Sequence, residues 1–152
     1  TVGEVKEIER FTREDWQVRL SVSLHAANNE LRSELVPLNR KYPLERLHDA
    51  IARYCDQTGR QFTFEWTMLN GVNDSEACAR ELLEFCVGLK VSVNLIPWNP
   101  VSGLPYDPTP LAQCTRFCQI LEEGGLKVTL RREKGQDIDA ACGQLRRTHG
   151  AA

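Results

Sequence analysis

The apolar residues of this chain follow two periods that alternate along the sequence. Between residues 17 and 24 an apolar residue stands at every second position, which is the period of a strand with one buried face. Between residues 43 and 57 apolar residues recur every three or four positions, which is the period of a helix. Together the two periods predict a helix at 4–13, a strand at 17–24, helices at 28–35 and 43–57, a strand at 61–69, a helix at 75–87, a strand at 91–96, a helix at 109–123 and a strand at 126–131.

Helix-ending residues fit these boundaries. Pro37 ends the helix at 28–35, and Gly59 ends the next one. The proline-rich loop at 97–110 is too rigid for a flexible linker, and no low-complexity segment divides the sequence. We therefore expect residues 1–152 to form a single domain.

Strands that alternate with helices are typical of parallel βαβ units with right-handed crossover helices. The sequence thus predicts an α/β fold, in which four strands form either part of a (β/α) barrel or a small open sheet. In both folds functional residues gather at the carboxyl ends of the strands. The polar residues expected on this rim are Ser23 and His25, then Asn70, Asn73 and Asp74, then Asn99, then Arg131 and Arg132 with the loop that carries Cys142.

The rim residues also have structural interpretations. His25 is a candidate acid, base or ligand, but a lone loop histidine is more often a hydrogen-bonded structural residue. Ser23 and Asn99 are ordinary turn formers, and the polar residues at 70–74 are interpreted as turn and cap chemistry without a function. Glu65, a carboxylate in an otherwise apolar strand, is expected to point into a barrel interior or to pair with a cation.

Composition places the chain among ordinary globular proteins, with 41% hydrophobic and 26% charged residues. No apolar run approaches the roughly 20 residues of a membrane span, and the N-terminus lacks the plan of a signal peptide. Six cysteines invite a disulfide framework, which we reject because nothing marks the chain as secreted. Cys114 and Cys118 share a helix face, but no third metal ligand stands at a useful spacing nearby. A reduced, cytoplasmic protein is the prediction.

The charge is unevenly distributed. The whole chain carries −2, whereas residues 126–152 hold six basic and three acidic residues, a net +3. Such a basic end can meet phosphates, or it can be an ordinary solvated tail.

Residues 135–145 follow the last predicted strand and have neither helical nor strand periodicity. Small residues on both sides of Cys142 leave room for a reactant to approach its thiol. The alternative is a buried cysteine that packs as a small hydrophobe. The common phosphate-binding glycine loops are absent, which argues against a phosphate-binding lyase of barrel type.

Several segments carry a resemblance to a known family. They are residues 22–26 (VSLHA), 29–33 (NELRS), 36–43 (VPLNRKYP), 64–65 (FE), 70–74 (NGVND), 93–100 (VNLIPWNP), 103–106 (Gly-x-Pro-Tyr) and 137–145 (DIDAACGQL). In these segments the sequence resembles the C-terminal half of the radical S-adenosylmethionine enzymes that methylate adenosine C(2) in 23S ribosomal RNA, and in bacteria also in transfer RNA.

The resemblance implies the later strands of a partial (β/α)6 barrel and a C-terminal cysteine loop. It implies that Ser23, Leu24, His25 and Asn99 hold S-adenosylmethionine. It also implies that Cys142 is methylated first and then delivers the carbon to the adenine, which must be presented unstacked.

The family's Cys-x3-Cys-x2-Cys motif, which binds a 4Fe-4S cluster, is absent from this chain. We therefore expect a fragment that is inactive alone. Two function classes stay open: the C-terminal half of an RNA methyltransferase, or a non-catalytic half-barrel that binds RNA or another partner. A barrel cut midway also predicts an unpaired edge at strand 17–24, an unclosed apolar face and self-association through that edge.

Overall fold

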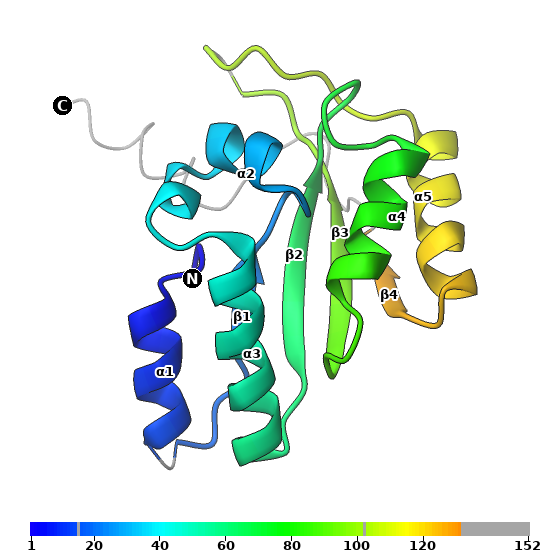
Figure 1. The fold of residues 1–152 in the computed structure, drawn as a ribbon. Coiled ribbons are helices and arrows are strands. Elements are labelled where there is room, and N and C mark those ends of the chain that lie inside the picture. Colours follow the sequence, from blue (N-terminus) through cyan, green and yellow to red (C-terminus); the bar gives the residue numbers. More distant parts are fainter. Residues whose placement is uncertain (15, 102, 132–152) are drawn as a thin grey trace, which may run out of the picture.

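Four parallel strands form one sheet in the order β1-β2-β3-β4, as the alternating periods predict (Figure 1). The computed structural model describes residues 1–14, 16–101 and 103–131. The strands are β1 (Ser21–Ser23), β2 (Phe62–Met68), β3 (Val91–Pro97) and β4 (Lys127–Leu130), and the helices are α1 (Val5–Arg13), α2 (Asn29–Leu35), the 3-10 helix η1 (Pro37–Arg40), α3 (Leu44–Thr58), α4 (Glu76–Phe85) and α5 (Leu111–Glu123).

The sequential strand order decides where the helices lie. When each right-handed crossover leads to the next strand in line, all crossover helices fall on the same face of the sheet. Burial along β2 shows this directly, because Phe62, Phe64, Trp66 and Met68 are fully buried while the residues between them are partly exposed.

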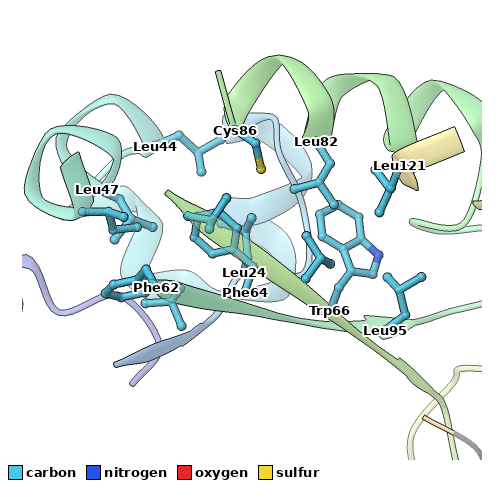
Figure 2. Close-up of a cluster of buried hydrophobic side chains, with 14 of the residues drawn as sticks. Leu24, Leu44, Leu47, Phe62, Phe64, Trp66, Leu82, Cys86, Leu95 and Leu121 are labelled. Carbon is cyan, nitrogen blue, oxygen red and sulfur yellow. The ribbon is translucent and has the colours of Figure 1, made fainter. Parts of the chain in front are cut away.

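The core is the layer between the sheet and these helices. Figure 2 shows Phe62, Phe64 and Trp66 of β2 in one cluster with side chains from both neighbouring strands and from the helices. The other labelled members of the cluster are Leu24, Leu44, Leu47, Leu82, Cys86, Leu95 and Leu121. Burying one such large apolar side chain contributes about 1.5–3 kcal/mol to the stability of the fold. The apolar face of each strand therefore turns toward the helices, and the opposite face is left for binding and chemistry.

Strand β1 is shorter than the sequence predicts. Ser21 pairs with Thr63, so residues 17–19 extend past the start of β2 and have no strand beside them there. The outer edge of β1 is partly occupied, because the main chain of Thr1 donates to the Ser21 carbonyl and accepts from the Ser23 amide. The predicted unpaired edge is therefore only partly open.

The helix boundaries largely follow the capping residues. The side chain of Asn28 accepts a hydrogen bond from the Leu31 amide and starts α2. Gly59 ends α3 in the left-handed conformation, with φ of 67°. Helix η1 was not predicted: Pro37 ends α2 but then forms the first residue of this short turn. None of the helices within the described residues is long and apolar enough to cross a membrane.

Candidate functional site

The sheet face that the helices leave uncovered carries polar side chains. Two rows stand in register across all four strands, Ser21, Thr63, Ser92 and Lys127 in one and Ser23, Glu65, Asn94 and Thr129 in the next. Successive side chains of a strand point to opposite faces, so these rows share the face opposite the core. The expectation of an unclosed apolar face is therefore wrong for the described residues, because the alternation that buries the apolar residues leaves polar ones on this side.

Glu65 lies in the middle of this polar face. Its Oε2 accepts a hydrogen bond of 2.7 Å from Asn94 Nδ2, and its side chain is partly exposed. No ion pair within the described residues involves Glu65. Of the two expectations for this residue, the position on the uncovered face agrees with the structure and the pairing with a cation does not.

His25 follows β1 and sits at the carboxyl end of the sheet. It is a non-glycine residue with positive φ, at 60°, a conformation that is uncommon outside glycine but is adopted more often by asparagine, aspartate and histidine than by other residues. The Thr67 amide donates a hydrogen bond of 3.1 Å to its Nδ1. Because Nδ1 is an acceptor, the neutral ring carries its proton on Nε2.

The ring of His25 is neutral at physiological pH. Burial, and secondarily the positive charge of Arg32, lower the pKa of His25 to about 4. Arg32 is itself almost fully buried and donates hydrogen bonds to the Asn39 side chain and the Val2 carbonyl. His25 is thus a fixed hydrogen-bond donor through Nε2 rather than an acid near neutral pH.

Asn73 holds His25 in place, a role that the sequence did not reveal. This fully buried side chain donates to the carbonyls of His25 (2.9 Å) and Thr67 (2.8 Å) and accepts from the Leu69 amide (2.7 Å). It joins the carboxyl ends of β1 and β2. Its position in an Asn-Asp-Ser run predicts a cap, but the contact with residue 25 depends on the sheet order and leaves no local signal.

Asp74 supports the same end of the sheet. Its Oδ1 accepts from the Gly71 amide at 3.0 Å, and its Oδ2 accepts from the Thr109 hydroxyl at 3.1 Å. The β2–α4 loop is thereby tied to the segment that leads into α5. Asp74 and Asn73 act together as the frame of the rim, which extends their predicted turn and cap role.

The other predicted cofactor residues are placed differently from one another. Ser23 is partly exposed in the polar row, whereas the Leu24 side chain is fully buried in the core (Figure 2). The Leu24 amide donates to the Glu65 carbonyl, so this residue locks β1 to β2. Asn99 follows β3 in an exposed loop, and no hydrogen bond among the described residues joins it to Ser23 or His25.

The loop after β3 presents an ordered aromatic pair. Trp98 Nε1 donates to the Tyr106 carbonyl at 3.1 Å, and the two rings meet edge to face with centroids 6.0 Å apart. This contact closes the proline-rich loop on itself beside Asn99. Arg131, whose amide donates to the Leu95 carbonyl, begins the segment after β4.

The described cysteines are thiols of the core. Cys55, Cys78, Cys86 and Cys114 are buried, and burial raises the pKa of Cys86 to about 12. Burial likewise raises the pKa of Cys114 and of Cys118. Within the described part of the chain no three His, Cys, Asp or Glu side chains are grouped to hold a metal ion. Cys142 and residues 135–145, like Arg132, lie outside the described residues.

Comparison with known proteins finds relatives that share one name. A protein of Desulforudis audaxviator named a probable dual-specificity RNA methyltransferase RlmN is 55% identical over 150 residues, which cover 98% of this chain and 47% of the relative. A protein of the same name from Syntrophomonas wolfei is 47% identical over 146 residues, covering 96% of this chain and 41% of the relative. The chain spans less than half the length of these relatives. No family model matches it.

Solved structures agree with the fold. A radical SAM methyltransferase from Sphaerobacter thermophilus superposes with a TM-score of 0.91 at 50% identity, over 95% of this chain and 42% of that protein. A domain of a pyruvate-formate lyase-activating enzyme from Bacteroides vulgatus superposes with a TM-score of 0.61 at 20% identity, which speaks for the fold alone. The α/β fold with parallel strands from a partial radical SAM barrel is thereby confirmed.

Proposed function

We propose, on the premise that the chain belongs to the family of radical S-adenosylmethionine RNA methyltransferases, that it is the C-terminal half of an enzyme that methylates adenosine C(2) in 23S ribosomal RNA and in transfer RNA. The observation that carries the proposal is the identity of 47–55% to RNA methyltransferases over almost the whole chain. Its reduced thiols accord with work in the cytoplasm, where these RNAs are modified.

The described residues fit S-adenosylmethionine, which supplies the methyl group when bound. Ser23 offers a hydroxyl on the uncovered polar face, and His25 offers a neutral Nε2–H held by the Thr67 amide. Both are polar groups of fixed position that can orient a nucleoside without adding charge. The Leu24 side chain is buried in the core, so Leu24 would act indirectly, by locking β1 to β2 through its amide and so holding its two neighbours in place. Asn99 would contribute from the exposed loop.

The described residues do not fit a 4Fe-4S cluster. Three thiolates at suitable spacing are needed, whereas the chain lacks the Cys-x3-Cys-x2-Cys motif and its described thiols are mostly buried with raised pKa. The cluster of the proposed enzyme would be held by segments that the longer relatives have in addition. We therefore propose that this chain alone does not catalyse methyl transfer.

Cys142 is the proposed methyl carrier. Its support is the sequence around it, Asp-Ile-Asp-Ala-Ala-Cys-Gly-Gln-Leu, which resembles the carrier segment of the family. The small residues Ala141 and Gly143 on either side suit a thiol that has to meet both a cofactor and a base. RNA would approach with its target adenosine unstacked, because adenine C(2) is covered by stacking within a helix.

Methylation of defined RNAs by the intact protein tests the proposal. The protein is reconstituted anaerobically with iron and sulfide. It is then incubated with S-adenosylmethionine, a one-electron reductant such as dithionite, and either a 23S ribosomal RNA fragment or transfer RNA. Nuclease digestion and mass spectrometry should find 2-methyladenosine in both RNAs. Methylation of neither RNA contradicts the proposal, and methylation of ribosomal RNA alone narrows its substrate range.

A second candidate function is a non-catalytic half-barrel that binds RNA or another partner. The absence of the cluster motif and the net +3 charge of residues 126–152 favour it. The two candidate functions predict different results. If the second is correct, the chain alone binds RNA in a salt-dependent manner, and the full-length protein does not methylate RNA.

A further inference from the structure

The proline-rich loop between β3 and α5 carries two aromatic side chains that have no role so far. In Figure 1 this yellow-green loop projects beyond the carboxyl ends of the strands, farther than the helices do. Trp98 stands near the start of the loop and Tyr106 near its end, and both side chains are partly exposed. Their rings therefore lie at the end of the sheet where functional residues gather, and not in the core.

The two rings are held in a fixed geometry. Trp98 Nε1 donates to the Tyr106 carbonyl at 3.1 Å, and the rings meet edge to face with an interplanar angle of 86°. The end of the loop is tied to the neighbouring loop, because the Asn70 amide donates to the Asp107 carbonyl at 3.0 Å. An aromatic surface that is already in place loses little conformational entropy when a ligand stacks on it.

The composition of the loop indicates which kind of ligand suits it. Residues 98–108 include one charged residue, Asp107, and no basic one. Other exposed side chains of the loop are apolar, since Leu104 is 50% exposed and Pro105 is also exposed. An RNA phosphate would meet no cation of this loop, whereas the flat face of a base needs only an aromatic surface. The loop is therefore suited to a base rather than to a phosphate.

We propose that the ring pair of Trp98 and Tyr106 stacks on a base of the RNA that is adjacent to the target adenosine. This rests on the proposed function, in which the target adenosine leaves the stack of its neighbours. A neighbouring base then has one face without a partner, and an aromatic ring replaces the lost contact. Because the loop projects beyond the sheet, it meets a base outside the site while the target base enters. Trp98 offers the larger ring, and Tyr106 positions it.

The experiment compares variants of the protein with variants of the RNA. Fluorescence anisotropy measures the affinity of the intact, reconstituted protein for a labelled RNA that it methylates, a transfer RNA or a 23S ribosomal RNA fragment. Two further RNAs carry an abasic nucleotide directly 5′ or directly 3′ of the methylated adenosine. Trp98→Leu should weaken binding of the unaltered RNA about tenfold, which lies within the range that stacking of one base supplies. It should barely affect binding of one abasic RNA, in which the stacked base is already missing.

Two control variants separate stacking from a structural role of the loop. Trp98→Phe loses the bond from Nε1 to the Tyr106 carbonyl but keeps an aromatic face, so it should retain most of the affinity. Trp16 is a matched control, because it is 47% exposed and packs edge to face against Phe11 with centroids 4.9 Å apart. It lies between α1 and β1, at the opposite end of the sheet, so Trp16→Leu should bind all three RNAs as the parent does.

Thermal melts show that each variant is folded. Unchanged binding of the unaltered RNA by Trp98→Leu overturns the proposed contact. An equal loss for all three RNAs also overturns it, because the tryptophan would then act through the fold of the loop or through another part of the RNA. An intact protein that methylates neither kind of RNA overturns the proposed function itself, and the contact with it.

Discussion

At the scale of single residues, the polar positions found from the sequence differ in how far the structure supports them. Ser23 lies on the polar sheet face and His25 at the carboxyl end of β1. Both positions could be predicted, because strand alternation and the loop after β1 are local features. The bridging contacts of Asn73 and the hydrogen bond between Asn94 and Glu65 depend on which strands are neighbours. Residue type alone predicted neither, since the same residues also form caps and ion pairs.

Substitution of Cys142 distinguishes a methyl carrier from a structural thiol. In the intact protein, Cys142→Ala should leave cofactor binding unchanged and abolish methylation of adenosine, because alanine cannot carry the methyl group. Mass spectrometry of the active parent should find one added methyl on the peptide containing Cys142. Cys114→Ala is the control within the fold, since that thiol is buried and should affect stability but not chemistry. Substantial methylation by Cys142→Ala would remove the carrier assignment.

The lowered pKa of His25 predicts a pH dependence of stability. In the unfolded chain the imidazole gains its proton near pH 6.5, whereas in the folded protein it does so near pH 4. The unfolded state therefore binds more protons in this window, and stability falls as the pH is lowered from 6.5 to 4.

The variant for this test is His25→Asn, because asparagine tolerates the positive φ of 60°. Urea unfolding of the chain at a series of pH values should show a shallower loss of stability in the variant than in the parent. Carboxylates titrate in both proteins and cancel in the comparison. Parallel curves for the two proteins would show that His25 is not held neutral.

At the scale of elements, periodicity was sufficient for most of the fold. Four strands and five α-helices stand where the apolar patterns place them, and their ends fall near the predicted proline, glycine and asparagine residues. The errors have tertiary causes. The strand predicted at 17–24 is cut to Ser21–Ser23 by the length of its neighbour, and η1 forms after Pro37, where only a helix end was predicted.

Asn73 tests how strongly the carboxyl ends of β1 and β2 are coupled. Asn73→Ala removes the three hydrogen bonds of a buried side chain and leaves the carbonyls of His25 and Thr67 and the Leu69 amide without this partner. We expect a loss of about 1–3 kcal/mol in the free energy of unfolding by urea. Asn70→Ala, at an exposed position, should change it by less than about 0.5 kcal/mol. Equal effects of the two substitutions would show that the bridge does not stabilise the rim.

At the scale of the whole molecule, the two faces of the sheet differ in whether other elements cover them. The helices cover the apolar face, while the polar face and part of the outer edge of β1 are left uncovered by the described residues. The Sphaerobacter thermophilus structure matches this chain closely yet is more than twice as long. The fold was predictable because each βαβ unit buries its own layer. The complete site was not, because a barrel interior is lined by more strands than these.

The partly open edge of β1 predicts self-association of the chain. The main chain of Thr1 engages the Ser21 carbonyl and the Ser23 amide, so the remaining outward groups should pair only weakly with a second copy. Light scattering after size exclusion should show a mass that rises with concentration. Ser21→Pro removes an outward amide while the inward bonds to β2 are kept, and it should lower this association. A constant monomer mass up to high concentration would contradict the prediction.

The final prediction concerns iron. The chain lacks the cysteine triplet, and the described cysteines belong to no group of three metal-binding side chains. Burial of thiols such as that of Cys86 also disfavours the thiolate that iron needs. After anaerobic reconstitution with iron and sulfide, the purified chain should be colourless and contain no bound iron by metal analysis. The intact protein, treated in parallel, should be brown and hold about four irons per chain, as one 4Fe-4S cluster requires. Stable iron–sulfur absorbance from the chain alone would mean that its own cysteines assemble a cluster, and it would overturn the division of the site between this chain and the rest of the enzyme.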